Sequence, residues 1–176
     1  MLKMDTTIQP TTKLYNALMI AYLAADDAGR ALDIWHDITH SVEGPSYNSL
    51  ATVFRVCEVL PMGDQKANEI WEKMRRMDIE VPPVVYAAYC GAIAGQGQVE
   101  EVKGLIQAME ADTGSPVDMM TIGVSYNALP GQSLQASFQE WAQAEYPALW
   151  KRLEKQGKKK TMDGLLSFNL NREMKA

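Results

Sequence analysis

Residues 67–74 read Ala67-Asn68-Glu69-Ile70-Trp71-Glu72-Lys73-Met74, with a small, a bulky and a medium apolar residue at positions i, i+4 and i+7. Residues at this spacing lie on one face of an α-helix, because each helical turn takes 3.6 residues. Most of the other positions are polar. The segment is therefore predicted to be an amphipathic helix whose apolar face is buried.

The same apolar pattern recurs along the chain. Its first and last positions are Ala31 to Ile38, Val102 to Met109 and Ser137 to Ala144, at steps of 36, 35 and 35 residues. A second apolar-periodic segment precedes each one, glycines separate the two, and prolines lie between successive units, where a helix must stop. Helix pairs that share apolar faces are typical of α-solenoids. The bulky residues at the shared position are Trp35, Trp71, Ile106 and Trp141, and we expect them in the core.

This period divides the chain into three parts. We predict an all-α fold with an N-terminal lead-in over residues 1–11, a right-handed α-solenoid over 12–146, and a C-terminal helix with an extended tail over 147–176. The repeats are expected at about 12–45, 46–82, 83–117 and 118–146. The helices are expected near 13–25, 28–40, 46–60, 63–77, 84–95, 98–111, 118–129 and 133–145, with a ninth from 147 to 157.

Composition supports a folded protein. The 176 residues are 47% hydrophobic and 22% charged, which is enough to bury a core. The longest apolar run, residues 84–95, is too short to span a bilayer, so no membrane span is expected. Cys57 and Cys90 cannot form a disulfide framework and are expected as core thiols. The net charge of −5 divides unevenly, because residues 1–150 carry −10 and residues 151–176 carry +5.

The repeat resembles a known family. Tyr15-Asn16 opens the first helix, glycine occupies the turn, and the second helix carries Ala-x-x-x-aromatic-x-x-Met with a period of about 35. This pattern resembles the pentatricopeptide repeat family. The related tetratricopeptide repeat would instead have Ala where Met74 and Met109 stand. The Tyr-Pro-x-Leu-Trp, Gly-Lys-Lys-Lys and Phe-Asn-Leu-Asn-Arg segments look like the C-terminal part of fungal mitochondrial members in the translational-activator group.

The resemblance implies binding of single-stranded RNA in mitochondria, although no targeting peptide is visible in the chain. In that family the residue after the opening Tyr contacts a base. Only Asn16 and Asn48 among these positions can form hydrogen bonds with bases, and Lys13 lies near the same face. The remaining family positions here are Ala87 and Ile122 after the opening residue, and Glu43, Pro82 and Val117 before it.

The C-terminal segment combines a basic cluster with an apolar end. The cluster is predicted to contact RNA phosphates or a partner, with a solvated helix end as the alternative. Apolar residues follow it that a disordered tail would not need, so this end is expected to dock on a partner. The basic residues are Lys151, Arg152, Lys155, Lys158, Lys159 and Lys160, and the apolar ones are Leu165, Leu166, Phe168 and Leu170.

Catalytic and metal motifs give little signal. His36 and His40 lie four residues apart and could share a zinc ion, but no third His follows, so exposed histidines are the favoured interpretation. The glycines of residues 91–97 end a predicted helix and indicate close helix packing and a turn rather than a phosphate loop. No enzymatic activity, cofactor, metal or small-molecule substrate is expected.

Two functions remain open from the sequence. The first is a helical-repeat RNA-binding protein of mitochondrial RNA metabolism or translation. The alternative is an acidic helical scaffold that mediates protein-protein contacts in a mitochondrial complex or an assembly associated with the mitochondrial ribosome. The acidic balance of residues 1–150 favours the scaffold, whereas the family resemblance favours RNA.

Overall fold

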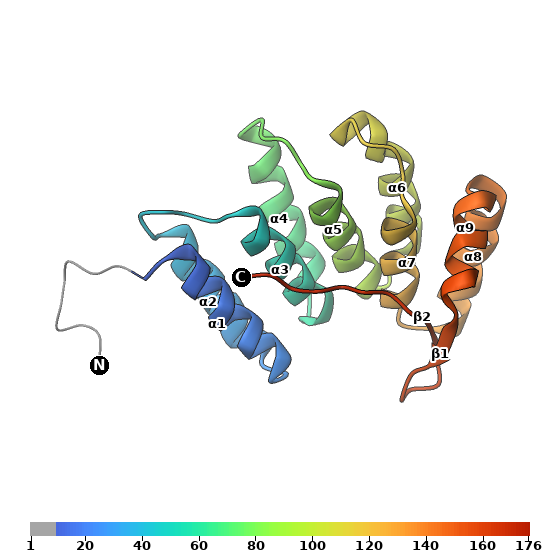
Figure 1. Cartoon of the computed structure of the whole chain (residues 1–176), viewed down its shortest axis with the longest axis horizontal. Coiled ribbons are helices and arrows are strands. Elements are labelled where there is room, and N and C mark those ends of the chain that lie inside the picture. Colours follow the sequence, from blue (N-terminus) through green and yellow to red (C-terminus); the bar gives the residue numbers. More distant parts are fainter. Residues whose placement is uncertain (1–9) are drawn as a thin grey trace.

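The computed structural model describes residues 10–176, so most of the predicted lead-in lies outside the described residues. This part of the chain forms nine helices and one two-stranded sheet (Figure 1). The all-α prediction is confirmed, and each predicted helix agrees with the structure within two residues at either end. The helices are α1 (Thr12–Ala24), α2 (Ala28–Thr39), α3 (Tyr47–Val59), α4 (Gly63–Arg76), α5 (Pro83–Gly95), α6 (Val99–Thr113), α7 (Met119–Ala128), α8 (Gln132–Glu145) and α9 (Pro147–Gln156).

Side-chain caps fix where four of these helices begin. The side chains of Thr11, Asp27 and Asp118 accept hydrogen bonds from backbone amides in the first turns of α1, α2 and α7. Ser46 and Ser49 form a reciprocal capping box at the start of α3. These bonds satisfy amides that have no partner within the helix, which is why such residues set helix boundaries.

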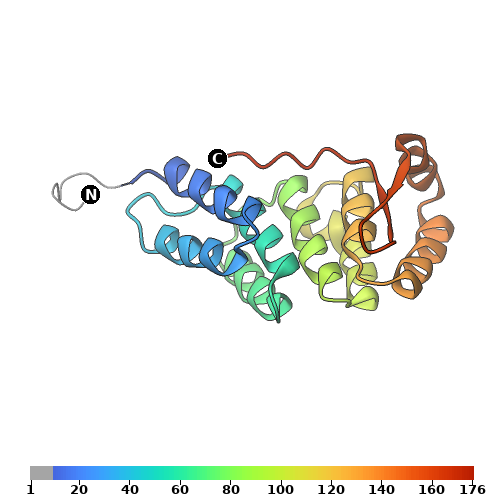
Figure 2. The ribbon, with the colours of Figure 1, turned by 90° about the horizontal axis from the view of Figure 1, so that it is seen from below.

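The helices lie in two rows. The odd-numbered helices α1, α3, α5 and α7 lie side by side in chain order, and each packs on the even-numbered helix that follows it (Figures 1 and 2). Helix α9 closes the C-terminal end by packing on α7 and α8. The apolar stripes of the even-numbered helices therefore face the row formed by the odd-numbered ones.

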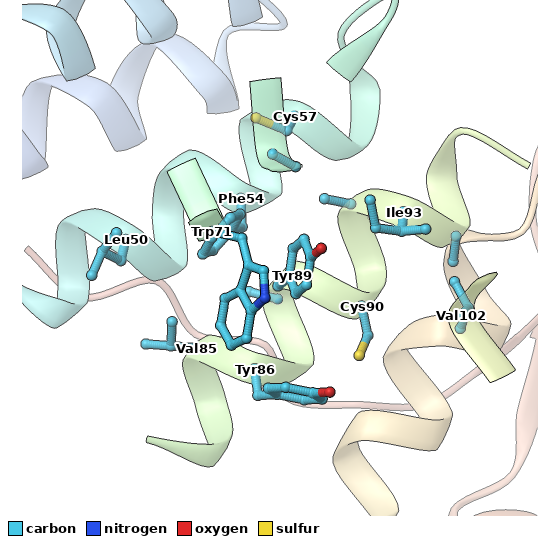
Figure 3. Packing of buried hydrophobic residues seen from close by; sticks show 14 of the residues in the cluster. Leu50, Phe54, Cys57, Trp71, Val85, Tyr86, Tyr89, Cys90, Ile93 and Val102 are labelled. Atoms are coloured by element: carbon cyan, nitrogen blue, oxygen red, sulfur yellow. The ribbon is translucent and has the colours of Figure 1, made fainter. Parts of the chain in front are cut away.

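Aromatic residues fill the space between the rows (Figure 3). The Trp71 ring stacks on Tyr89 with centroids 4.6 Å apart and meets Tyr86 edge-on at 5.4 Å. The centroid of the Phe54 ring lies 5.3 Å from that of Tyr89. Cys57 and Cys90 are free and buried in the same core, as predicted. The periodic residues of α2, α4 and α6 are likewise buried, which confirms the helical face inferred from their spacing.

The predicted register is wrong in the last unit. The buried residues of α8 are Gln135, Phe138 and Ala142, whereas Trp141 is only partly buried and Ala144 is exposed. Helix α8 packs against α9 as well as α6, and the aromatic Phe138 lies toward Tyr126. The C-terminal end thus has different neighbours from the preceding units, and its buried face is rotated accordingly.

The C-terminal tail contains strands that the sequence analysis did not predict. Strands β1 (Lys158–Lys160) and β2 (Leu166–Phe168) pair antiparallel, with Lys158 opposite Phe168. Gly157 and Gly164 have φ values of +79° and +85°, a conformation that glycine adopts without strain. The chain therefore turns back at this point, and residues 169–176, here named the C-terminal strap, run toward α3 (Figures 1 and 2).

Candidate protein-binding surface

The C-terminal strap crosses the face formed by α7, α5 and α3 (Figures 1 and 2). The strap follows directly on Phe168, the last residue of β2, which is only 1% exposed. The Phe168 ring lies 5.0 Å from that of Tyr126 and 5.1 Å from that of Trp150. The Lys158 ammonium lies 4.9 Å from the same ring, which is within range of a cation–π contact. This aromatic cluster fixes the base of the strap.

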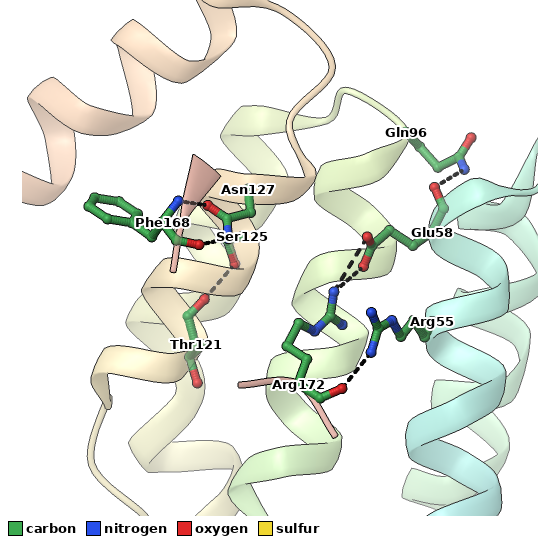
Figure 4. A network of polar contacts seen from close by, with 8 residues as sticks. All are labelled: Arg55, Glu58, Gln96, Thr121, Ser125, Asn127, Phe168 and Arg172. Atoms are coloured by element: carbon green, nitrogen blue, oxygen red, sulfur yellow. Dashed lines mark hydrogen bonds and ion pairs between the residues drawn. The ribbon is translucent and has the colours of Figure 1, made fainter. Parts of the chain in front are cut away.

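Two side-chain amides hold the backbone at the same place. The Phe168 amide donates to Asn127 Oδ1 at 2.7 Å, and Asn127 Nδ2 donates to the Phe168 carbonyl at 3.0 Å (Figure 4). Asn127 thus replaces the neighbouring strand that an edge residue would otherwise need. Gln135 Nε2 donates to the Leu166 carbonyl at 2.8 Å, and this bond holds the first residue of β2.

Beyond Phe168 the strap has the alternation of an extended chain. Leu170, Arg172, Met174 and Ala176 are partly buried, and the residues between them are exposed. Alternate side chains of an extended backbone point to opposite sides, so one side of the strap faces the helices. A Cβ atom on Gly123 would lie within 3.1 Å of Leu170, so this glycine makes room for the strap.

Arg172 forms the central polar contact under the strap (Figure 4). Its Nη1 atom lies 3.1 Å from Glu58 Oε1, and the two side chains are 18% and 16% exposed. Arg55 Nη1 donates to the Arg172 carbonyl at 2.7 Å. Burial raises the pKa of the Glu58 carboxyl, and the charge and hydrogen bond of Arg172 oppose that rise. Burial and the nearby Arg172 together lower the pKa of Arg55.

Neighbouring residues of α5 make this arrangement possible. A Cβ atom on Gly91 would lie 2.8 Å from both Glu58 Oε1 and Val124 Cγ1, so a larger residue would displace the ion pair. Gln96 Nε2 donates to the Cys57 carbonyl at 3.0 Å and to the Leu60 carbonyl at 2.8 Å, where α3 ends. Gly91 and Gln96 therefore allow α3 and α5 to lie close together, as predicted for the glycine-containing segment 91–97.

The far end of the strap leaves space beneath it. Asn48 Nδ2 donates to the Ala176 carbonyl at 3.0 Å. Between this bond and the Arg172 ion pair lies a cleft of about 310 Å³. We name the face below the strap the strap groove; its lining includes Asn48, Thr52, Arg55, Ala88, Met120 and Val124.

The structure separates the residues that were predicted to contact bases. Asn16 is 1% exposed; its amide donates to Ser46 Oγ at 3.1 Å and accepts from Ser49 Oγ at 2.5 Å. Asn48 is exposed, but it holds the end of the strap. Lys13 is exposed on α1. The corresponding positions Ala87 and Ile122 are 2% and 0% exposed. These positions therefore do not form one open surface along the odd-numbered helices.

The basic cluster is also divided. Lys158 is placed over the rings of Phe168, Tyr126 and Trp150, so it belongs to the anchor of the strap. The other basic residues of the cluster are exposed on α9 and β1; they are Lys151, Arg152, Lys155, Lys159 and Lys160.

The predicted docking residues lie against this chain itself. Phe168 is buried and Leu170 packs against the core, whereas Leu166 is 38% exposed and Leu165 is partly buried. The sequence analysis missed the residues that receive them, chiefly Asn127, Gln135 and the Arg55 and Glu58 pair. Their only sequence signal is a polar residue on an otherwise apolar helix, which is too common to identify a site.

Residues 10–176 offer neither a metal-binding group nor a membrane-spanning helix. Residues 10–176 contain no group of three or more His, Cys, Asp and Glu side chains placed to hold a metal ion. His40 Nδ1 lies 2.7 Å from the His36 carbonyl oxygen, within the end of α2. None of the helices within this range has the length and apolar character needed to cross a membrane.

Comparison with known proteins relates this chain to a mitochondrial protein. It is 41% identical over its whole length to complex I intermediate-associated protein 84, mitochondrial, of Neurospora crassa. The chain spans 17% of the length of that relative. No family model matches the chain. The mitochondrial location predicted from the sequence is confirmed by this relative.

These comparisons correct the predicted family. The assignment to the pentatricopeptide repeats and to their translational-activator group is wrong, because no family model matches and the relative is named for association with complex I. The RNA-binding and translational roles that rested on this resemblance are withdrawn with it. The physical reason is visible in the fold: a period near 35 reports stacked helix pairs, and it does not report what their surface binds.

Proposed function

We propose that this chain is part of a helical scaffold that contacts proteins of a mitochondrial complex I intermediate. The observation that carries the proposal is the 41% identity, over all of this chain, to a relative named for that association. The acidic scaffold was the alternative function in the sequence analysis. An identity that extends over every helix and the strap supports a shared surface as well as a shared fold.

The proposal includes the form of the scaffold. We propose that the two rows of helices build a right-handed α-solenoid of four helix pairs, with repeats at about 12–45, 46–82, 83–117 and 118–146. The contact of each odd-numbered helix with the next supports this arrangement, since solenoid repeats contact only their neighbours.

We further propose that the exposed basic residues give the scaffold a second contact. Lys151, Arg152, Lys155, Lys159 and Lys160 form no ion pair with residues of the described range 10–176. Their charge would favour an acidic protein surface and would raise the rate of association. This role does not require contact with RNA phosphates.

Affinity purification from mitochondria tests the proposed function. The protein that contains this chain is tagged, purified under mild conditions with and without ribonuclease, and analysed by native gels and mass spectrometry. Complex I subunits are expected to be enriched over abundant matrix proteins, equally in both samples. Absence of these subunits, or their loss after ribonuclease treatment, would contradict the proposal.

A further inference from the structure

The C-terminal strap is held by few main-chain contacts. Its first amide, that of Asn169, donates to the Gly157 carbonyl at 2.9 Å. None of the amides of residues 170–176 donates a hydrogen bond to another residue in the described part of the chain. Segments with solvent-exposed backbone and few buried contacts open locally at low free-energy cost. The strap is therefore the part of this face most easily detached.

The side chains also become less buried from Phe168 toward the end of the strap. Phe168 is fully enclosed, whereas Leu170, Arg172 and Met174 are only partly buried. The cleft of about 310 Å³ remains between the last residues of the strap and the helices. The strap groove is thus larger than the segment that occupies it, and another segment can fill it more completely.

The groove contributes its recognition groups from the helices. Glu58 supplies a carboxylate that needs a cation, and Arg55 supplies a donor for a carbonyl group of an extended chain (Figure 4). Asn48 supplies a second donor of this kind. Gly91 and Gly123 leave the space that the incoming side chains use. All of these groups belong to α3, α5 and α7 and not to the strap itself.

We propose that the strap groove binds an extended segment of a partner protein in exchange for the C-terminal strap. The segment would carry an Arg two residues after an aliphatic residue, to match Glu58 and the space at Gly123. This inference rests on the proposed function, since it gives the protein partner a site. The largely buried Glu58 carboxylate selects a cationic peptide side chain at this position, as Arg172 of the strap does.

A peptide-exchange experiment tests the proposal with the intact chain. The probe is a fluorescent peptide with the sequence of residues 165–176, and its binding is followed by anisotropy. The wild-type chain must release its own ion pair before the peptide binds. The Arg172→Ala chain has no such contact to release, so it is expected to bind the peptide about ten-fold more tightly or better, the effect of one charge-assisted hydrogen bond. The matched control is Lys175→Ala, an exposed position of the strap, which should behave as wild type.

Two further variants make the result specific. A probe in which Arg172 is replaced by Ala should bind the Arg172→Ala chain about ten-fold more weakly than the original probe. Adding Glu58→Gln to that chain should abolish the difference between the two probes. Thermal unfolding of each variant shows whether it is folded, and Arg172→Gln replaces Arg172→Ala if the latter is not.

Hydrogen exchange gives a readout that needs no variant. In the wild-type chain the amides of residues 170–176 are expected to exchange as fast as those of an unfolded peptide, while the amides of α5 stay protected. Slow exchange in the strap would overturn the proposal, because the strap would then be a permanent part of the fold. A folded Arg172→Ala chain that binds neither probe would also overturn it.

Other outcomes distinguish the occupants and the two proposals. Dimers of the Arg172→Ala chain in sedimentation experiments would show that a second copy fills the groove and would overturn the partner proposal. If complex I subunits co-purify equally with wild type and with Glu58→Gln, this inference fails and the proposed function stands. If peptide exchange occurs but no complex I subunit co-purifies, the proposed function fails separately.

Discussion

Phe168→Ala is the substitution that most directly tests how the strap is anchored. The ring is 1% exposed and touches Tyr126, Trp150 and the Lys158 ammonium, so its removal leaves a cavity lined by three large side chains. Buried Phe-to-Ala changes cost about 3–5 kcal/mol. The site lies at the end of the helix rows, where the tail can partly collapse, so we expect the lower figure, about 3 kcal/mol.

For a chain of this size that loss corresponds to a melting temperature lowered by about 6–12 °C. Circular dichroism melts and urea titrations of the Phe168→Ala and wild-type chains measure the effect. The matched control is Leu166→Ala on the same strand, which is 38% exposed and should change stability by less than about 1 kcal/mol. Equal stability of the Phe168→Ala and wild-type chains would refute the reasoning, because a ring enclosed by these partners cannot be removed without cost.

Gly91→Ala is expected to destabilise the chain by about 1–3 kcal/mol in urea titrations, since the new Cβ would lie 2.8 Å from the Glu58 carboxylate. Its control, Gly104→Ala on α6, meets nothing within 4 Å and should instead gain about 0.5–1 kcal/mol; equal effects would disprove the packing argument. Burial raises the pKa of Cys57 to about 12 and raises that of Cys90 as well, so iodoacetamide at about pH 8 should modify both thiols only after unfolding. Because burial raises the pKa of Glu58 above its ordinary 4.5, the folded chain keeps this proton to higher pH than the unfolded chain. The stability of wild type relative to Glu58→Gln should therefore decline as pH rises from 4.5 through the folded pKa, and urea titrations from about pH 4 to 8 that show a constant difference would contradict this sign.

The scaffold and the strap are connected by one structural feature. The odd-numbered helices would form an open face in a simple array of helix pairs, yet here the chain's own C-terminal segment covers much of it. Covering this face removes apolar and polar groups from water. The proposed contact with an assembly intermediate would need a surface that engages and releases, and the proposed exchange of the strap would supply one.

The sequence alone determined the fold class and the helix boundaries. The spacing of Ala67, Trp71 and Met74 repeats in units of about 35 residues, and Pro and Gly residues lie where the helices end. Such signals are local, since they depend on residues within two or three turns of each other. The same rule failed for Trp141, because α8 packs on α9 as well as on α6 and α7.

Only the tertiary structure decided which surfaces are open and which are covered. Arg172 meets Glu58 across 114 positions of sequence, and no local pattern links them. Asn16 stood at a base-contacting position in the family assignment that the comparisons corrected, and it is buried against Ser46 and Ser49. A helix periodicity fixes which side of a helix is apolar. Whether the other side meets water, a partner or the chain's own C-terminus depends on contacts between distant segments, and these form only in the folded chain.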